Sequence, residues 1–420
     1  MLRVPVEQAK AGMVLAHSVP NPQKPEHTLL KAGYELLEED IERLRSLRVW
    51  SLWVRYPSLD FLDELLDPEM TRQQQEMYGV LKGQFESTQD ISFAKVDYSV
   101  YVRQVGQLFQ RLLATQSRSA KFISELHGES DDIFLHGTTV AHLALLIGLR
   151  LQGYLVHERN RLPVHLATDL TPLGVGCLLH DLGKLKLPED RRSFRLTAGD
   201  RGDGVWQSHT EAGFEMVQGG LDAGAGQVVI NHHQHFDGSG FPARREQICG
   251  SGEVWTLRGH EIHIFCRIAT VADRFDGFRR LPDGRLAPTV VALKRMANPG
   301  YVKWFDPEVY RAFQETVPPF AQGEQVTLNN GQDVVVVELN ERDPCRPVVR
   351  PVDLARACVG HQAAGRDKEE PEQDNDINLA SRLDLRIAKV GSFDVTPYLT
   401  AGQSEREHGK LAAVGRGRRG

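Results

Sequence analysis

Residues 171–184, TPLGVGCLLHDLGK, are the most informative stretch of the chain. Their first nine residues form an apolar, helix-like run that ends directly at the doublet His180-Asp181. A second apolar run, residues 223–230 (AGAGQVVI), leads in the same way to His232-His233. Ionisable side chains at the ends of buried helices need partners, and a metal cluster is one way to supply them. The two doublets therefore predict helices that end at a metal site.

Three more residues of metal-ligand type complete the set, namely His136, His209 and Asp273. Imidazole and carboxylate together suit iron, manganese or zinc, and a carboxylate can bridge two such ions. Each motif also has an ordinary interpretation, because a lone histidine such as His136 is more often hydrogen-bonded or exposed than bound to metal. The order of the motifs, with the glycine-rich segment DGSGFP at 237–242 after the second doublet, favours a metal centre.

The combined motifs resemble the HD-GYP phosphodiesterases, a branch of the HD-domain metal-dependent phosphohydrolases. The matching segments are FLHGTTVAHLA around His136, LLHDLGKLKLP around His180, QSHTEAG around His209, NHHQHFDGSGFP from Asn231 and RIATVADRFDGF around Asp273. The resemblance covers residues 126–318. It implies an all-helical core with two or three bridged divalent transition metals, iron or manganese before others. It also implies hydrolysis of cyclic di-GMP to linear pGpG and, in some members, to GMP.

The resemblance also assigns roles to single residues. Asp181 would bridge the ions, with His136, His180 and Asp273 around one and His209, His232 and His233 around the other. Lys184, one turn beyond Asp181, would act in catalysis by stabilising charge on the phosphate or helping to protonate the leaving oxygen. A solvated surface lysine is the alternative. Asp132 stands where members with a third metal carry a glutamate, and an acidic residue that favours a helix N-terminus is the alternative.

Two segments depart from the family pattern. Gly-Tyr-Pro becomes Gly240-Phe241-Pro242, which keeps the turn and the ring but loses the hydroxyl, and we expect this loop to pack beside the metals and to contact substrate or a signalling partner. The family's Arg-Pro-Tyr-Arg segment, whose basic groups hold substrate, is also altered. Arg285 takes the second basic position, Pro282 replaces the first, and Arg279 or Arg280 could compensate. A cyclic di-GMP receptor or partner-binding module without activity, and a phosphohydrolase acting on another nucleotide, therefore remain as alternatives.

The bulk composition narrows the function classes. A net charge of −6 gives no global basic field for duplex nucleic acid. Five cysteines without paired spacing favour a reducing compartment over a disulfide framework. The first residues, MLRVPVEQAKAG, have no apolar signal core, and the most apolar stretch, residues 137–148, is too short for a bilayer span. We expect a cytoplasmic protein with no membrane span.

The sequence pattern divides the chain into five parts. Residues 1–60 predict a small N-terminal α+β domain, with a helix over 38–47 and a strand over 49–54. Residues 61–125 form a helical connector, residues 126–318 the catalytic domain, residues 319–390 a small β module, and residues 391–420 a flexible tail. The fold class is therefore mainly α, a helical HD-domain core with a small domain at each side.

Two details within these parts can be tested by structure. The connector carries apolar residues at three- and four-residue spacing, which suits a connecting or homodimerising helix or an ordinary core helix: Val102, Val105, Leu108, Phe109 and Leu112. In the β module, Asn330-Gly331 lies between alternating apolar runs and predicts a hairpin. The charged segment 361–377 predicts a mobile loop.

Overall fold

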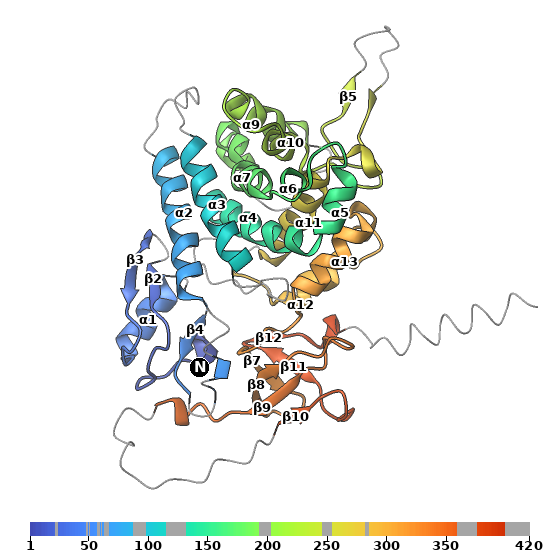
Figure 1. Ribbon diagram of the computed structural model, residues 1–420. Helices are drawn as coiled ribbons and strands as arrows, with labels where there is room; N and C mark the ends of the chain where they lie inside the picture. The colour runs from blue at the N-terminus through green and yellow to red at the C-terminus, as the bar shows by residue number, and fades with distance from the viewer. Residues whose placement is uncertain are drawn as a thin grey trace, which may run out of the picture.

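The fold is mainly helical, as the sequence predicts, with two small β-containing units beneath one helical body (Figure 1). This computed structural model describes residues 1–399 apart from 22–23, 48, 50, 57–58, 60, 63–66, 87–97, 115–131, 193–202, 246–253, 282–284 and 359–375. The predicted mobile loop lies almost wholly outside the described residues, and so does the tail beyond residue 399.

The helical body holds the α-helices that follow the N-terminal unit. They are α2 (Pro68–Glu86), α3 (Tyr98–Ala114), α4 (Ile133–Arg150), α5 (Gln152–Glu158), α6 (Val164–Ala167), α7 (Thr171–Leu179), α8 (Gly204–Gln207), α9 (His209–Val217), α10 (Ala223–Asn231), α11 (Ile264–Arg279), α12 (Thr289–Met296) and α13 (Pro307–Thr316). Short 3-10 turns connect them, among which η5 (Leu182–Lys186) follows the first doublet and η9 (Val302–Trp304) precedes α13. A two-stranded ribbon, β5 (Arg244–Arg245) with β6 (Val254–Trp255), projects from the body (Figure 1).

Helix α4 lies at the centre of this body, where α7 and α11 pack against it. Every residue from Phe134 to Leu149 is buried. By length and composition α4 is the one helix, among the described residues, that could cross a membrane, but 89% of that window is buried inside the protein. A core helix meets the same criterion, because it is apolar on all sides.

Helices α2 and α3 belong to the same core. Val105, Leu108, Phe109 and Leu112 are buried in one apolar cluster with residues of α4 and α7, whereas Val102 is 47% exposed. Helix α3 is therefore packed as an ordinary core helix, which was one of the interpretations of this segment. Homodimer formation stays a prediction.

The N-terminal unit pairs its strands around one helix. β1 (Leu2–Pro5) pairs antiparallel with β4 (Ser51–Val54), β2 (Val19–Asn21) pairs with β3 (Lys24–Leu30), and α1 (Glu38–Ser46) packs between them through Ile41 and Leu44. Helix α1 and strand β4 lie where the sequence pattern predicts a helix and a strand.

The C-terminal unit is a six-stranded antiparallel sheet in the order β10-β9-β8-β7-β11-β12. Its strands are β7 (Gln325–Leu328), β8 (Asp333–Glu338), β9 (Val348–Pro351), β10 (Ile377–Asn378), β11 (Ile387–Val390) and β12 (Phe393–Asp394). The β7–β8 hairpin turns at Asn330-Gly331, where Gly331 has a φ of +85°. Because β12 and the turn Thr396–Tyr398 follow residue 390, the ordered module extends beyond the boundary predicted there.

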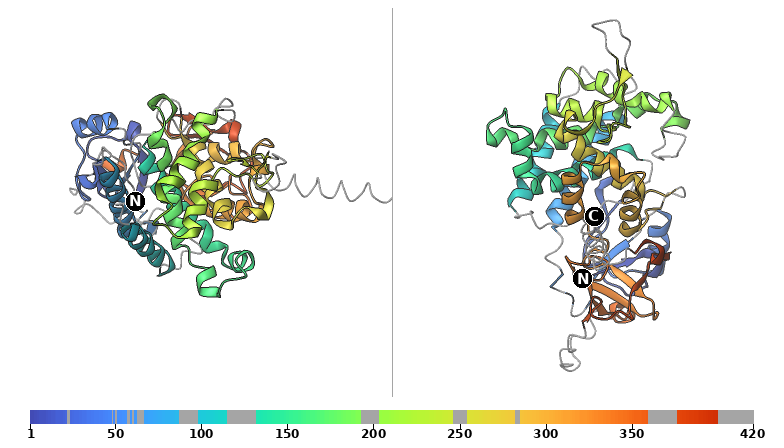
Figure 2. Two further views of the ribbon diagram at one scale, coloured as in Figure 1. Left: turned by 90° about the horizontal axis from the view of Figure 1, so that it is seen from above. Right: turned by 90° about the vertical axis from the view of Figure 1, so that its right-hand side faces the viewer.

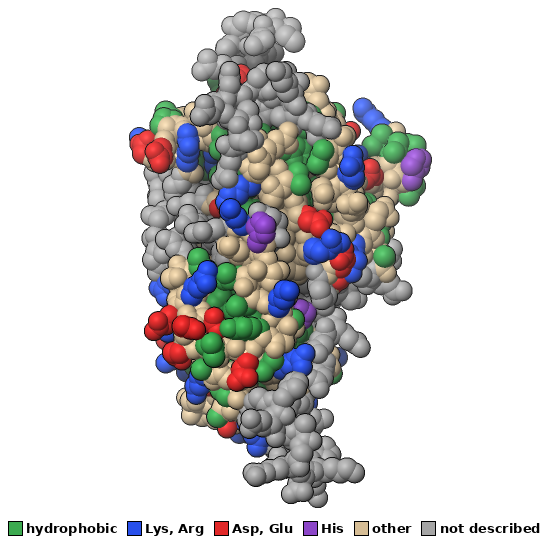
Figure 3. Space-filling view, turned by 90° about the vertical axis from the view of Figure 1, so that its left-hand side faces the viewer, with side chains coloured by type: hydrophobic (Ala, Val, Ile, Leu, Met, Phe, Trp, Pro, Cys, Tyr) green, Lys and Arg blue, Asp and Glu red, His purple; other side chains and the backbone are tan. Residues whose placement is uncertain are grey.

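The two flanking units share one apolar core, which the sequence did not predict. Val335 and Val337 of β8 pack in the same cluster as Leu2, Val4 and Leu52 of the N-terminal unit. The backbone N–H of Arg3 donates to the carbonyl of Gly323 at 2.9 Å. Figure 1 shows these units side by side beneath the helices, and the right-hand view of Figure 2 shows both at the same end of the molecule. The face in Figure 3 carries basic and acidic side chains close together.

Candidate metal centre

Five elements bring the seven ligand-type side chains to one buried region. His136 lies in the first turn of α4, His180 and Asp181 follow α7, His209 begins α9, His232 and His233 follow α10, and Asp273 lies in α11. Each of them is buried. Because the apolar faces of these helices fill the same core, the polar ends of α7 and α10 meet inside the protein and not at its surface.

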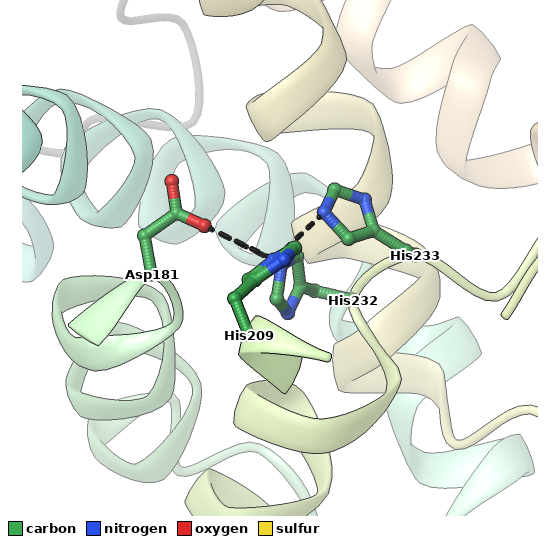
Figure 4. Close-up of side chains that lie close together, drawn as sticks. All are labelled: Asp181, His209, His232 and His233. Carbon is green, nitrogen blue, oxygen red and sulfur yellow. Dashed lines mark hydrogen bonds and ion pairs between the residues drawn. The ribbon is translucent and has the colours of Figure 1, made fainter. Parts of the chain in front are cut away.

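Asp181 stands between two groups of imidazoles. Its Oδ2 lies 3.5 Å from His136 Nε2 and 3.4 Å from His180 Nε2. Its Oδ1 lies 3.5 Å from His209 Nε2 and 3.7 Å from His232 Nε2 (Figure 4). One carboxylate thus faces a different pair of histidines with each oxygen, which is the arrangement of a bridging ligand.

Asp273 and His233 complete the two groups. Asp273 Oδ1 lies 3.1 Å from His136 Nε2 and 3.8 Å from His180 Nε2, on the Oδ2 side of Asp181. His233 Nε2 lies 3.2 Å from His209 Nε2, on the other side. The structure therefore brings together the seven residues in the two groups that the sequence predicts, and their role as ligands stays a prediction.

The outer nitrogens of four rings fix how these rings are turned. The Nδ1 atoms of His180, His209 and His232 donate to the carbonyls of Cys177 at 2.6 Å, Trp206 at 2.5 Å and Val229 at 2.9 Å. His136 Nδ1 donates to Asp276 Oδ2 at 2.7 Å. A carbonyl or carboxylate oxygen only accepts, so each of these Nδ1 atoms carries a proton and each Nε2 faces the cluster. Metal-binding histidines are held in this way.

A second, independent observation indicates that these residues suit a bound cation, namely buried polar atoms without partners. His180 Nε2, Asp181 Oδ1 and Asp273 Oδ2 are buried and have no hydrogen-bond partner. A buried polar atom without a partner costs about 1–3 kcal/mol, and more when it is charged. Three such atoms in one cluster are explained by bound cations that they contact.

The charge states also suit a cation. Burial opposes ionisation of Asp181, but Lys184 and His180 outweigh it and hold the pKa of this carboxyl well below its usual range. Burial lowers the pKa of His209 to about 4, and the nearby Lys184 adds to this effect. Burial also lowers the pKa of His180, but Asp181 and Asp273 outweigh it and raise that pKa to about 10. Metal binding would therefore displace a proton from His180.

Lys184 lies inside the site. Its side chain is 4% exposed, and Nζ donates to Asp181 Oδ2 at 2.6 Å. The surface-lysine interpretation is therefore wrong, while a role in catalysis stays a prediction. Gly183 makes this position reachable, because a Cβ there would lie 1.9 Å from the carbonyl oxygen of His209. Only glycine lets η5 approach α9 so closely.

A small cavity opens beside the cluster. Its volume is about 20 Å³, and its walls are formed by His136, Lys184, Trp206, His233, Asp273, Arg274, Gly277 and Phe278. This space holds about one water molecule. A larger molecule can therefore place only one small group in this cavity, next to the cluster.

Comparison with known proteins identifies this arrangement. Residues 168–309 match the family model described as HD domain, a range that contains six of the seven residues and excludes His136. A Pseudomonas aeruginosa protein named cyclic di-GMP phosphodiesterase PA4108 is 25% identical over 385 residues, which are 85% of this chain and 86% of that protein. Residues 168–309 therefore form an HD domain, and the protein is an HD-type phosphodiesterase. The resemblance to the HD-GYP branch is thereby confirmed.

Two other matches are more limited. A Vibrio cholerae protein named 3'3'-cGAMP-specific phosphodiesterase 2 is 32% identical over 103 residues, which are 23% of this chain and 17% of that protein. A solved structure titled Bd1817, an HDG"Y"P protein from Bdellovibrio bacteriovorus, is 16% identical with a TM-score of 0.41 and covers 75% of this chain and 98% of its own.

The Gly-Phe-Pro loop of this HD domain lies against the cluster. The ring centroid of Phe241 is 4.6 Å from that of His233, and the Phe241 N–H donates to the carbonyl of His233 at 3.1 Å. A Cβ on Gly240 would lie 2.3 Å from the same carbonyl oxygen, so the loop needs glycine there. Gln234 Nε2 donates to the carbonyl of Pro242 at 2.7 Å. The loop packs where the sequence predicts, and its contacts with substrate or partners stay predictions.

The three arginines expected to hold substrate do not line the cavity of the HD domain. Arg285 places its guanidinium over the ring of Phe393 in β12, 4.9 Å from the centroid. Arg279 is buried where α11 ends, and burial lowers its pKa to about 10. Leu281 and Ala287, on either side of this segment, pack in the cluster of the C-terminal sheet, so Arg285 lies at that sheet and not at the cavity.

Arg280 acts on the cluster through another residue. Its Nε and Nη2 donate to Asp276 Oδ2 at 2.8 and 2.6 Å, and the same oxygen accepts from His136. Sequence reasoning missed Asp276, although it lies three residues after Asp273 and thus on the same side of a helix. It also missed Arg274 and Trp206, which line the cavity. No sequence signal distinguished these two residues from ordinary helix residues.

Asp132 is the N-cap of α4. Its Oδ1 accepts from the N–H groups of Phe134 and Leu135 at 2.9 and 3.0 Å, and its Oδ2 accepts from Tyr78 Oη at 2.5 Å. Both oxygens therefore have partners in the helix start and in α2. The capping interpretation describes Asp132, and a third metal there stays a prediction.

Proposed function

We propose that this HD-domain enzyme hydrolyses cyclic di-GMP in the cytoplasm to linear pGpG, which the same centre could cleave further to GMP. The position of Asp181 between two groups of histidines is the observation that carries this proposal. The name of the Pseudomonas relative, which aligns over 85% of this chain, supports the choice of substrate.

Two divalent transition metals, iron or manganese, would be held by this chain. His136, His180 and Asp273 would hold one ion, His209, His232 and His233 the other, and Asp181 both. Bound ions of this kind supply Lewis-acid charge to phosphate oxygens and lower the pKa of water at neutral pH. The imidazoles are turned for this task by the carbonyls and by Asp276 that accept from their Nδ1 atoms.

Lys184 would carry the positive charge closest to the reacting phosphate. Its ammonium group lies at the cavity wall, 2.6 Å from Asp181 Oδ2. Phosphodiester cleavage places additional negative charge on the phosphate oxygens and on the leaving oxygen. A buried ammonium group stabilises this charge more strongly than one in water, or donates a proton to the leaving oxygen.

The cavity restricts how a dinucleotide can bind. Its volume of about 20 Å³ excludes a guanine base, so only the scissile phosphate would reach the cluster while the rest of the substrate lies outside. The Gly-Phe-Pro loop beside His233 would border that outer part. Homodimer formation and contact of this loop with signalling proteins remain further predictions.

A second substrate has its own support. The match to the Vibrio protein named 3'3'-cGAMP-specific phosphodiesterase 2 covers 103 residues at 32% identity, which is higher identity than the longer match shows. Both nucleotides present the same kind of diester to the centre. A receptor that binds the nucleotide without cleaving it is the rival from outside the enzyme class.

The test is anaerobic purification, metal analysis and turnover of cyclic di-GMP and 3'3'-cGAMP by wild type, Asp181→Ala and a control. We expect at least two ions per chain and rapid formation of pGpG by wild type, and loss of both ions and of turnover in Asp181→Ala. The control is Asp190→Ala, an exposed aspartate nearby in the chain. Binding of nucleotide that persists uncleaved for hours with full metal content would refute the enzyme in favour of the receptor.

A further inference from the structure

Trp206 is a buried residue whose polar atom has no role in the fold. It lies in the short helix α8, three residues before His209, and is 4% exposed. Its backbone carbonyl accepts from His209 Nδ1 at 2.5 Å, which orients that imidazole. Its indole Nε1 is buried and makes no hydrogen bond to the protein.

The ring of Trp206 forms part of the wall beside the cluster. Its centroid lies 4.9 Å from that of His209, 5.1 Å from His233 and 5.6 Å from Phe241. The ammonium group of Lys184 lies 5.5 Å from the same centroid, over the ring. A cation over an indole face is attracted to it, so the ring helps to keep Lys184 at the cavity.

The donors around this cavity select the chemistry of what binds there. The indole nitrogen only donates, and the ammonium group and the guanidinium group also only donate. Lys184 and Arg274 line the cavity together with Trp206. A group that fits three donors of this kind carries several acceptor oxygens and negative charge, and a phosphate has both.

We infer that Trp206 is a substrate-binding residue of this centre, which donates its indole N–H to a non-bridging oxygen of the phosphate. The inference rests on the proposed function in one respect, because it takes the substrate to be a phosphodiester. The free N–H is left unsatisfied in the folded protein, which costs about 1–3 kcal/mol, and gains its partner when the phosphate arrives.

Two substitutions separate this role from packing. Trp206→Phe keeps an aromatic ring and the backbone carbonyl that holds His209, and removes the N–H. Trp206→benzothienylalanine keeps the size and shape of indole and replaces N–H with sulfur, so it serves if the phenylalanine variant loses stability. The control is Trp53→Phe, which alters a tryptophan 6% exposed that packs in the N-terminal unit and is not part of the cavity wall.

The measurements use metal-loaded protein and probes that contain no nucleotide. Calorimetric titration with inorganic phosphate gives the affinity, and hydrolysis of bis(p-nitrophenyl) phosphate gives KM and kcat separately. Loss of one hydrogen bond to a charged group should weaken phosphate binding and raise KM by about tenfold or more. Metal content should stay at the wild-type level, and Trp53→Phe should leave phosphate affinity, KM and kcat unchanged.

Unchanged phosphate affinity and KM in the benzothienylalanine variant would overturn the inference and leave Trp206 as a packing residue. An equal loss in Trp53→Phe would overturn it as well, since the effect would then follow from the loss of any buried tryptophan. If phosphate binding depends on Trp206 while cyclic di-GMP is not cleaved by wild type, the inference stands and the proposed substrate fails.

Discussion

Asp276 offers the sharpest test of how the chain builds its metal centre. Its Oδ2 accepts from His136 Nδ1 at 2.7 Å and from both donor atoms of Arg280 that face it. Burial opposes ionisation of Asp276, but Arg280 and His136 outweigh it and hold its pKa below the usual range. We therefore expect Asp276→Asn to weaken metal binding while the fold is retained.

The size of this effect follows from the geometry. Asparagine has the shape of aspartate but no charge and one acceptor oxygen. If the amide oxygen takes the place of Oδ2, His136 and Arg280 keep an acceptor without its charge, and if the amide nitrogen takes that place, its N–H₂ opposes the N–H groups of both residues. Loss of such an outer partner typically lowers metal affinity by roughly 10- to 100-fold, equivalent to about 1.4–2.7 kcal/mol. The loss should fall on the ion that His136 holds.

The assay is competitive titration of metal-free protein with a chelator, followed by metal analysis per chain. Asp276→Asn should lose one ion before the other, and excess metal should restore most of its activity. Arg280→Gln is the matched control, because it removes the ion pair and leaves the carboxylate next to His136, so its loss should be smaller. Equal affinities for both ions in Asp276→Asn and wild type would refute the view that Asp276 positions His136.

Three further predictions concern other parts of the site and the fold. Lys184→Met should keep both ions and lose at least about 100-fold in kcat, since its charge acts on the transition state, and unchanged kcat with full metal content would remove Lys184 from catalysis. Arg285→Ala should leave KM for substrate within about twofold of wild type and lower only the melting temperature, because its guanidinium lies over Phe393; a large rise in KM would restore Arg285 to substrate binding. Burial lowers the pKa of His263, the N-cap of α11, from 6.5 to about 4, so it is neutral in the folded protein but protonated in the unfolded chain below pH 6.5. The neutral imidazole therefore contributes on the order of 2 kcal/mol to the free energy of unfolding above pH 6.5, and this contribution is lost as the pH falls towards 4. His263→Asn keeps a cap acceptor, so in chemical unfolding it should lose less stability between pH 7.5 and 4.5 than wild type does. Equal losses in both proteins would contradict this assignment.

The ends of the helices could be predicted because one local pattern determines each of them. The apolar runs before His180 and His232 become α7 and α10, which end one residue before the doublets. The capping role of Asp132 was one of two interpretations that the sequence allowed, and only its contacts with Phe134, Leu135 and Tyr78 distinguish them.

The arginines show where such reasoning stops. The position of Arg285 depends on contacts with the C-terminal sheet, where Leu281 and Ala287 pack and where Phe393 lies under its guanidinium. The spacing of residues within this segment of the sequence does not predict those contacts. Trp206 was missed for a related reason, because a tryptophan in an amphipathic segment is usually a packing residue, and only the missing partner of its Nε1 distinguishes it.

The common core of the two flanking units has a consequence for how this architecture can vary. Val335 and Val337 of the C-terminal sheet pack against Leu2 and Val4, more than three hundred residues away in the chain. A chimera that receives residues 1–62 from a relative would set these valines against a foreign surface, so the two units must be exchanged as a pair. The far end of α11, the helix that carries Asp273, lies beside the same junction, where Arg279 is close to Arg3 and Glu324. Grafting a new sensory unit onto this enzyme therefore means rebuilding the support of one metal-site helix.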